Sequence, residues 1–92
     1  MKNMNINDVL NVKEANIIDV RETFEYAGGT VPGAKNIPMM GLIANADQFL
    51  NKDEEYYIMC QAGGRSMQVC DSLEVDGYSV VNLAGGYGSF NR

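Results

Sequence analysis

The chain has 92 residues, of which 46% are hydrophobic and 21% are charged, and its formal net charge is −5. This length and composition predict one soluble globular domain over residues 1–92, with a single modest core. The acidic balance argues against nucleic-acid binding through a basic face, and two cysteines without a histidine leave too few ligands for a metal site.

The first half of the chain alternates short apolar runs with turn signals. The run Ile-Ile-Asp-Val at 17–20 predicts a buried strand, and a short polar helix is expected over 22–27. Proline and glycine bracket a brief extended segment at 34–37. Residues 39–50 predict one or two short helices, broken near Asn45.

The second half predicts two more strands with a helix between them. Residues 56–59 are apolar and rich in aromatic side chains, which is typical of a buried strand. A glycine-containing loop leads to a helix over 66–75, for which Gly77 is a suitable C-cap. A strand over 80–83 precedes a last short segment that ends near Phe90. Strands separated by helical crossovers predict an α/β fold, with a parallel sheet and helices on both faces.

The sequence indicates no membrane anchor and no secretion signal. Residues 1–5 lack the apolar run of a signal peptide, and the longest nearly apolar stretch, residues 39–44, is too short to cross a membrane. We therefore expect a cytoplasmic protein. We also expect no cofactor. In a reducing cytoplasm, a reactive cysteine is catalytic or redox-active far more often than structural.

One segment, residues 57–66, brings together groups that stabilise an anion. Cys60 follows the second buried strand, and ligands of open α/β sheets bind beyond such strand ends. Gly63 and Gly64 can adopt positive φ, so that successive backbone N–H groups curl into an anion-binding nest. The helix that follows adds the partial positive charge of its N-terminus, and Arg65 adds a permanent charge. The pattern predicts that the sulfur of Cys60 is held as a thiolate.

The free energy needed to lower the pKa of a thiol shows how many groups must act together. Lowering a thiol pKa from ~8.5 to ~6.5 requires about 2.7 kcal/mol, whereas a helix terminus alone supplies about 0.3–1 kcal/mol. The loop amides and Arg65 would have to supply the rest. Such a thiolate could take a sulfur atom from a donor as a persulfide and pass it to a thiol or cyanide. The alternative is that Cys60 is an inert buried side chain, but its neighbours favour the reactive interpretation.

These residues resemble the active-site loop of the rhodanese family, Cys-x-x-Gly-x-Arg-Ser, which residues 60–66 match at every specified position. Segments 18–26, 31–38 and 77–86 are similar to further landmarks of the family, in the same order. The resemblance implies a three-layer rhodanese-like fold with a mostly parallel five-stranded sheet, and Cys60 as the catalytic nucleophile that carries a persulfide. It also implies a substrate-binding set that cradles the sulfur, namely Gln61, Ala62, Gly63, Gly64, Arg65 and Ser66.

Several neighbouring side chains have two possible roles. Asp19 and Arg21 end the first strand, where we expect an ion pair, either Arg21–Glu25 or one centred on Asp19, that braces the loop. A direct contribution of Arg21 to the site is the alternative. Arg65 either contacts the substrate or braces the loop. Cys70 is expected in the core and not as a resolving thiol for the reactive cysteine.

One further position departs from the family pattern. The family often has a histidine where this chain has Thr30. We expect Thr30 to be a local capping residue without a catalytic role.

The sequence therefore predicts a sulfurtransferase that moves sulfur from a small donor, such as thiosulfate or a persulfide, to a thiol or cyanide acceptor. A persulfide-carrying protein is a further candidate partner. Two other functions remain open. Cysteine phosphatases and arsenate reductases also hold an oxyanion over a thiolate, but typically with Cys-x5-Arg, whereas Cys60 and Arg65 are spaced as Cys-x4-Arg. A non-catalytic interaction or sulfide-sensing module could use the same fold.

Overall fold

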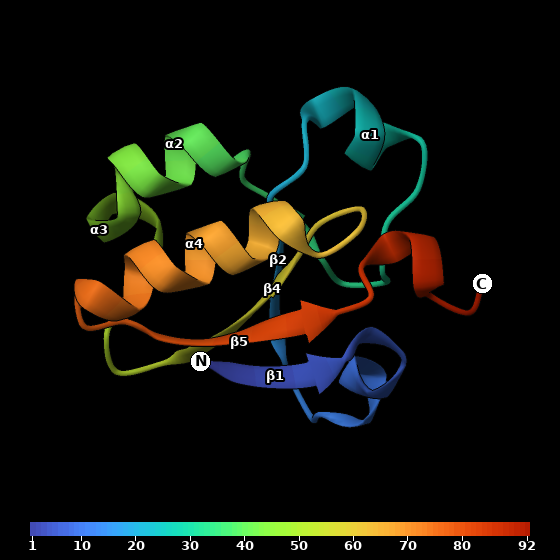
Figure 1. The fold of residues 1–92 in the computed structure, drawn as a ribbon, viewed down its shortest axis with the longest axis horizontal. Helices are drawn as coiled ribbons and strands as arrows, with labels where there is room; N and C mark the ends of the chain where they lie inside the picture. The colour runs from blue at the N-terminus through green and yellow to red at the C-terminus, as the bar shows by residue number, and fades with distance from the viewer.

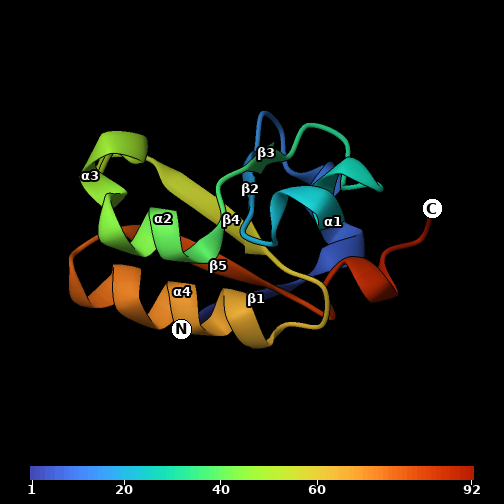
Figure 2. The same ribbon diagram turned by 90° about the horizontal axis from the view of Figure 1, so that it is seen from above.

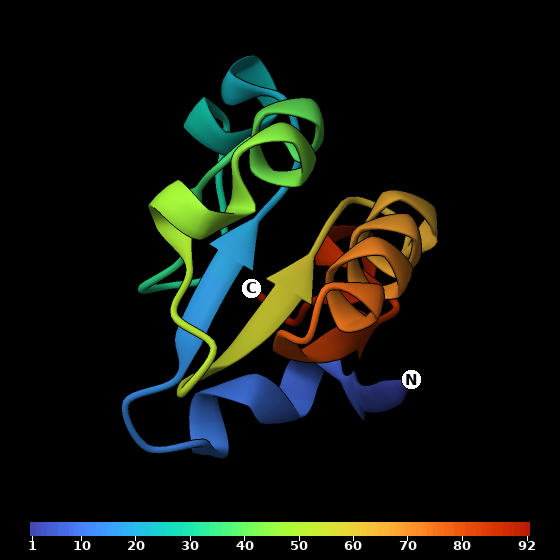
Figure 3. The same cartoon turned by 90° about the vertical axis from the view of Figure 1, so that its left-hand side faces the viewer.

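A five-stranded sheet forms the centre of the molecule in the computed structural model, which describes residues 1–92. The strands lie in the order β1-β5-β4-β2-β3, and every pairing is parallel. Figure 3 shows β2 and β4 running in the same direction. The strands are β1 (Lys2–Asn5), β2 (Asn16–Asp19), β3 (Lys35–Asn36), β4 (Glu55–Met59) and β5 (Ser79–Ala84). The carboxyl ends of β2 and β4 therefore meet at one edge of the sheet.

Helices cover both faces of this sheet. On one face, α2 (Met39–Ala44), α3 (Ala46–Phe49) and α4 (Gly64–Val75) share a core with the strands, and α2 and α4 lie side by side (Figures 1 and 2). The other face is covered by two short 3-10 helices, η1 (Ile6–Asn11) and η2 (Tyr87–Ser89). The remaining helix, α1 (Thr23–Ala27), buries none of its residues.

The alternation of side chains along β4 places the cysteine. Tyr56 and Ile58 pack into the core beneath α4, whereas Tyr57 and Met59 point into the core on the opposite face. Because side chains of a strand alternate between faces, Cys60 continues the row of Tyr56 and Ile58 and lies on the α4 side. Burial of both faces explains why this strand reads as a continuous apolar run.

The structure confirms the predicted α/β fold, including its parallel sheet with helices on both faces. Residues 39–50 form two helices with Asn45 between them, as the sequence indicates. The last long helix begins at Gly64, two residues earlier than expected, and Gly77 follows its end with φ 92°. None of the helices has the length and apolar character needed to span a bilayer.

Candidate active site

Cys60 immediately follows β4, and the loop after it brings polar groups to its sulfur. Gly63 has φ 110° and stands directly before α4, and its backbone N–H donates a hydrogen bond to Cys60 Sγ over 3.0 Å. The hydroxyl oxygen of Ser66, in the first turn of α4, lies 3.4 Å from the same sulfur. The positive φ that glycine allows at residue 63 lets the chain turn from this loop directly into α4.

Two opposing effects act on the thiol of Cys60. The residue is 1% exposed, and this burial raises the pKa of the thiol. Hydrogen bonds from the Ser66 hydroxyl and from the amides of Ser66, Gly63 and Ala62 stabilise the anion and leave the pKa below its ordinary value. The hydrogen bonds together outweigh burial, so the site stabilises the thiolate relative to that of an ordinary cysteine.

Arg65 pairs with a carboxylate and forms no hydrogen bond with the sulfur. Its guanidinium forms a bidentate ion pair with the carboxylate of Glu25 on α1, with N–O distances of 2.7 and 3.0 Å. The ion pair holds the pKa of Glu25 at about 2. The ion pair ties the loop to α1 through Arg65, and contact of Arg65 with a substrate stays a prediction.

The backbone of the cysteine loop (residues 60–65) accepts hydrogen bonds from residues near the C-terminus. The amide of Tyr87 donates to the carbonyl oxygen of Cys60 over 2.8 Å, and that of Gly88 donates to the carbonyl oxygen of Gln61 over 3.0 Å. The side-chain oxygen of Gln61 accepts a hydrogen bond from Arg21 at 3.0 Å. Only the backbone of Gln61 thus belongs to the loop that surrounds the sulfur.

Asp19 and Arg21 form a buried ion pair at the end of β2. Both are almost inaccessible, at 0% and 2% exposed, and the guanidinium donates to both carboxylate oxygens over 2.7 to 3.1 Å. Arg21 also donates to the carbonyl oxygen of Gly29 over 2.6 Å. The structure therefore shows an ion pair between Arg21 and Asp19. Glu25, the other partner considered for Arg21, pairs with Arg65 instead.

Thr30 differs from its expected role as a capping residue. Its hydroxyl donates to Asp19 Oδ2 over 2.9 Å, so it completes the hydrogen bonding of the buried carboxylate. A short polar side chain at this position satisfies an acceptor that burial has removed from water.

Cys70 lies in the core, as the sequence predicts. It is 0% exposed, and burial is the main cause that raises the pKa of its thiol to about 12. A thiol with this pKa is protonated at neutral pH and is a poor nucleophile.

The structure adds Asn82 to the site, a residue that the sequence analysis did not predict there. Asn82 lies on β5 and is 2% exposed, and its Oδ1 is 2.6 Å from the hydroxyl oxygen of Ser66. The available signal was an amide in the middle of the apolar strand predicted at 80–83, because buried polar groups need partners.

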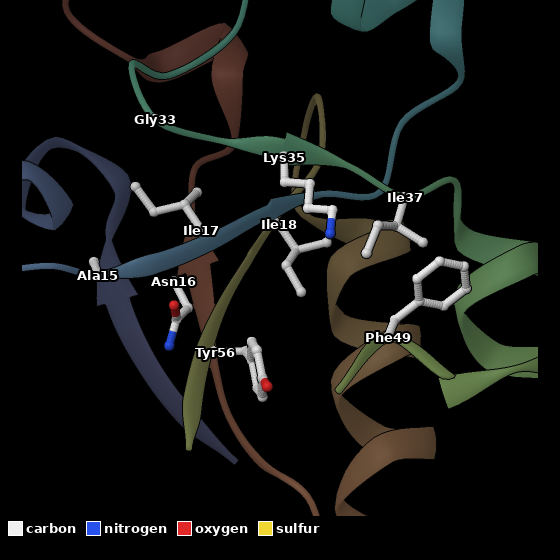
Figure 4. Close-up of a pocket in the computed structure, with 9 residues that line it drawn as sticks. All are labelled: Ala15, Asn16, Ile17, Ile18, Gly33, Lys35, Ile37, Phe49 and Tyr56. Atoms are coloured by element: carbon white, nitrogen blue, oxygen red, sulfur yellow. The ribbon is translucent and has the colours of Figure 1, made fainter. Parts of the chain in front are cut away.

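Neither of the two cavities in the structure includes Cys60. The one in Figure 4 has a volume of about 290 Å³ and lies between β2, β3 and α3, where Lys35, Phe49 and Tyr56 are among its lining residues. The other is lined by residues of α2 and α3 together with Lys52, Asp76 and Tyr78. No group of three or more His, Cys, Asp or Glu side chains comes together that could hold a metal ion.

Comparisons with known proteins agree on one family. The model of the rhodanese-like domain matches residues 3–92. YtwF of Bacillus subtilis is 45% identical over 74 residues, which are 80% of this chain and 71% of YtwF. The human thiosulfate:glutathione sulfurtransferase is 33% identical over 87 residues, 79% of this chain and 76% of that protein. Across the curated relatives that it matches, the chain spans between 29% and 76% of their length.

A solved structure gives the same result in three dimensions. The rhodanese-like domain protein from Staphylococcus aureus superposes with a TM-score of 0.86 at 40% identity, covering 99% of this chain and 92% of that one.

Proposed function

The chain belongs to the rhodanese-like domain family, and we propose that it is a sulfurtransferase in which Cys60 carries the transferred sulfur as a persulfide. The similarity to a named sulfurtransferase supports the class of reaction. The observation that carries the proposal for Cys60 is the hydrogen bond of 3.0 Å from the Gly63 amide to its sulfur. An amide in this position stabilises the Cys60 thiolate, both as the nucleophile of the first step and as the leaving group of the second.

The reaction consists of two displacements at sulfur. The Cys60 thiolate attacks the sulfane sulfur of the donor, a new S–S bond forms, and the donor leaves with the electron pair, as sulfite from thiosulfate or as a thiolate from a persulfide. An acceptor thiolate or cyanide then attacks the outer sulfur, and Cys60 leaves as a thiolate. Neither step needs a general base once the thiol is ionised. Because Cys60 is 1% exposed, we expect the cysteine loop to shift when it admits the second sulfur.

Intact-mass measurement tests the proposal directly. We expect the protein to gain the mass of one sulfur atom after exposure to thiosulfate or to a small organic persulfide, and to lose it again with cyanide. Cys60→Ala should gain nothing, and the matched control Cys70→Ala should gain as much as the unmodified protein. The proposal is wrong if no donor loads the protein or if Cys60→Ala is still loaded. Hydrolysis of an aryl phosphate that depends on Cys60 would instead indicate a phosphatase.

The ion pair of Arg65 leads to a prediction about the donor. Glu25 neutralises the charge of Arg65, and Asp19 that of Arg21, so neither of these arginines offers a free charge to attract a dianion. Glu25→Gln should therefore increase the rate of loading by thiosulfate about two- to fivefold, the range expected for a partly exposed ion pair. Glutamine keeps the side-chain oxygen that accepts from the Glu22 amide.

A second substitution separates this effect from a general change of charge. Glu22→Gln removes the same charge from the start of α1 and keeps the ion pair between Arg65 and Glu25. It should leave the rate of loading by thiosulfate unchanged, when that rate is divided by the rate of loading by an uncharged donor. Equal effects of the two substitutions would show that the pairing of Arg65 does not limit the use of thiosulfate.

A further inference from the structure

A row of polar side chains runs from the reactive sulfur through the interior to the edge of the sheet. Ser66 is 0% exposed and lies between Cys60 Sγ, at 3.4 Å, and Asn82 Oδ1, at 2.6 Å. On the far side, Nδ2 of Asn82 donates to Oδ1 of Asn3 on β1 over 3.0 Å. Asn3 is exposed, so the row connects the cysteine to a side chain at the surface.

The number of hydrogen atoms in this row of side chains limits which hydrogen bonds can form at the same time. A serine hydroxyl has a single hydrogen, and the Ser66 oxygen has three acceptors nearby, namely Asn82 Oδ1, the Gly63 carbonyl oxygen at 3.1 Å, and the sulfur. While Cys60 is a thiol, its S–H donates to Ser66 and Ser66 donates to Asn82. A thiolate only accepts, so Ser66 must then turn its hydrogen to the sulfur, and Asn82 Oδ1 loses its donor.

Rotation of the Asn82 amide removes this conflict. If Nδ2 and Oδ1 exchange places, Nδ2 donates to Ser66, Ser66 donates to the thiolate, and Oδ1 accepts from Asn3, whose exposed amide can turn as well. Both orientations leave every buried group with a partner. A hydroxyl that receives a hydrogen bond is also a stronger donor, so the reversed row strengthens the bond to the sulfur anion.

We propose that Asn82 is a positioning residue of the sulfur-transfer site, which orients the Ser66 hydroxyl toward Cys60 and reverses its own amide when the sulfur becomes an anion. The inference rests on the proposed function in that it concerns the thiolate that would accept the sulfur. Asn82 acts only through Ser66, since its bonded partners are Ser66 and Asn3.

The effect of Asn82→Val on the thiol follows from the same bonds. In the thiol form, Ser66 can donate to the Gly63 carbonyl oxygen instead of Asn82, so little is lost. In the thiolate form, Ser66 donates to the sulfur but receives no hydrogen bond. The substitution therefore disfavours the anion and should raise the pKa of Cys60 by about half to one pH unit, the size expected for one hydrogen bond.

The experiment is a titration of the Cys60 thiolate by its ultraviolet absorbance, in single and double variants. Cys70 does not interfere, because its pKa is about 12. We expect Asn82→Val to raise the midpoint, and to have no further effect when Ser66 is already replaced in Ser66→Ala. Val80→Ala, a buried change two residues earlier on β5, is the matched control and should leave the midpoint in place.

Two results would overturn the inference. One is an unchanged midpoint in Asn82→Val, and the other is a shift of the same size in the presence and absence of Ser66→Ala. If Asn82→Val does not fold, the isosteric Asn82→Asp replaces it, and its effect on the midpoint should be smaller in the Ser66→Ala background. Sulfur loading is measured separately by mass, so failure of the titration leaves the proposed function standing, and failure of loading leaves the titration interpretable.

Discussion

Arg21→Ala is expected to lower the free energy of unfolding by about 3–5 kcal/mol, the cost of leaving one member of a buried ion pair without its partner. Asp19, at 0% exposed, would lose the guanidinium and keep only the Thr30 hydroxyl and the backbone amide of residue 21. The carbonyl oxygen of Gly29 and the side chain of Gln61 would lose their donor as well. A domain of this size has a total stability of about 5–14 kcal/mol, so the substitution would remove at least about a fifth of it.

Urea unfolding of two arginine variants measures this effect against a control. Arg65→Ala also breaks an ion pair with a carboxylate, but the side chains of that pair are 34% and 20% exposed, so its loss should cost about 0.2–1 kcal/mol. The difference between the variants tests the role of burial. Equal losses of stability would mean that the Asp19–Arg21 pair does not hold the end of β2 together.

The fold could be predicted wherever a strand is buried on both faces. Tyr56 to Met59 is apolar at every position because both faces of β4 are covered. The strand β1 could not be found in this way, since it contains one partly buried apolar residue, Met4, and lies at the edge of the sheet, where it pairs with β5 alone. Pairing in three dimensions makes Lys2–Asn5 a strand, and composition does not reveal it.

In the candidate site, contacts between residues close in the sequence could be predicted, whereas contacts between distant residues could not. Cys60, Gly63 and Ser66 are close neighbours in the sequence, and the turn that joins them is recognisable from its glycines and the following helix. The pairing of Arg65 with Glu25 spans 40 residues, and that of Ser66 with Asn82 spans 16. Both depend on where α1 and β5 are placed by the fold.

Gly86→Ala is expected to displace the cysteine loop from the C-terminal turn. A Cβ atom at residue 86 would lie 2.4 Å from the carbonyl oxygen of Gln61 and 2.7 Å from that of Cys60, and backbone atoms cannot rotate out of the way. Gly86 also has φ 65° and ψ −177°, a region open almost only to glycine. The strained backbone alone would cost about 1–3 kcal/mol, and the overlap adds to it.

Relief of that overlap should also displace Cys60, because the residues after Gly86 donate hydrogen bonds to the carbonyl oxygens of Cys60 and Gln61. We expect lower stability in urea and slower alkylation of Cys60 at neutral pH. Gly41→Ala is the matched control, since its Cβ would meet nothing within 4 Å in α2 and should stabilise the helix by up to about 1 kcal/mol. If Gly86→Ala kept the alkylation rate of Cys60, as the control should, the turn would stabilise the fold without holding the sulfur in place.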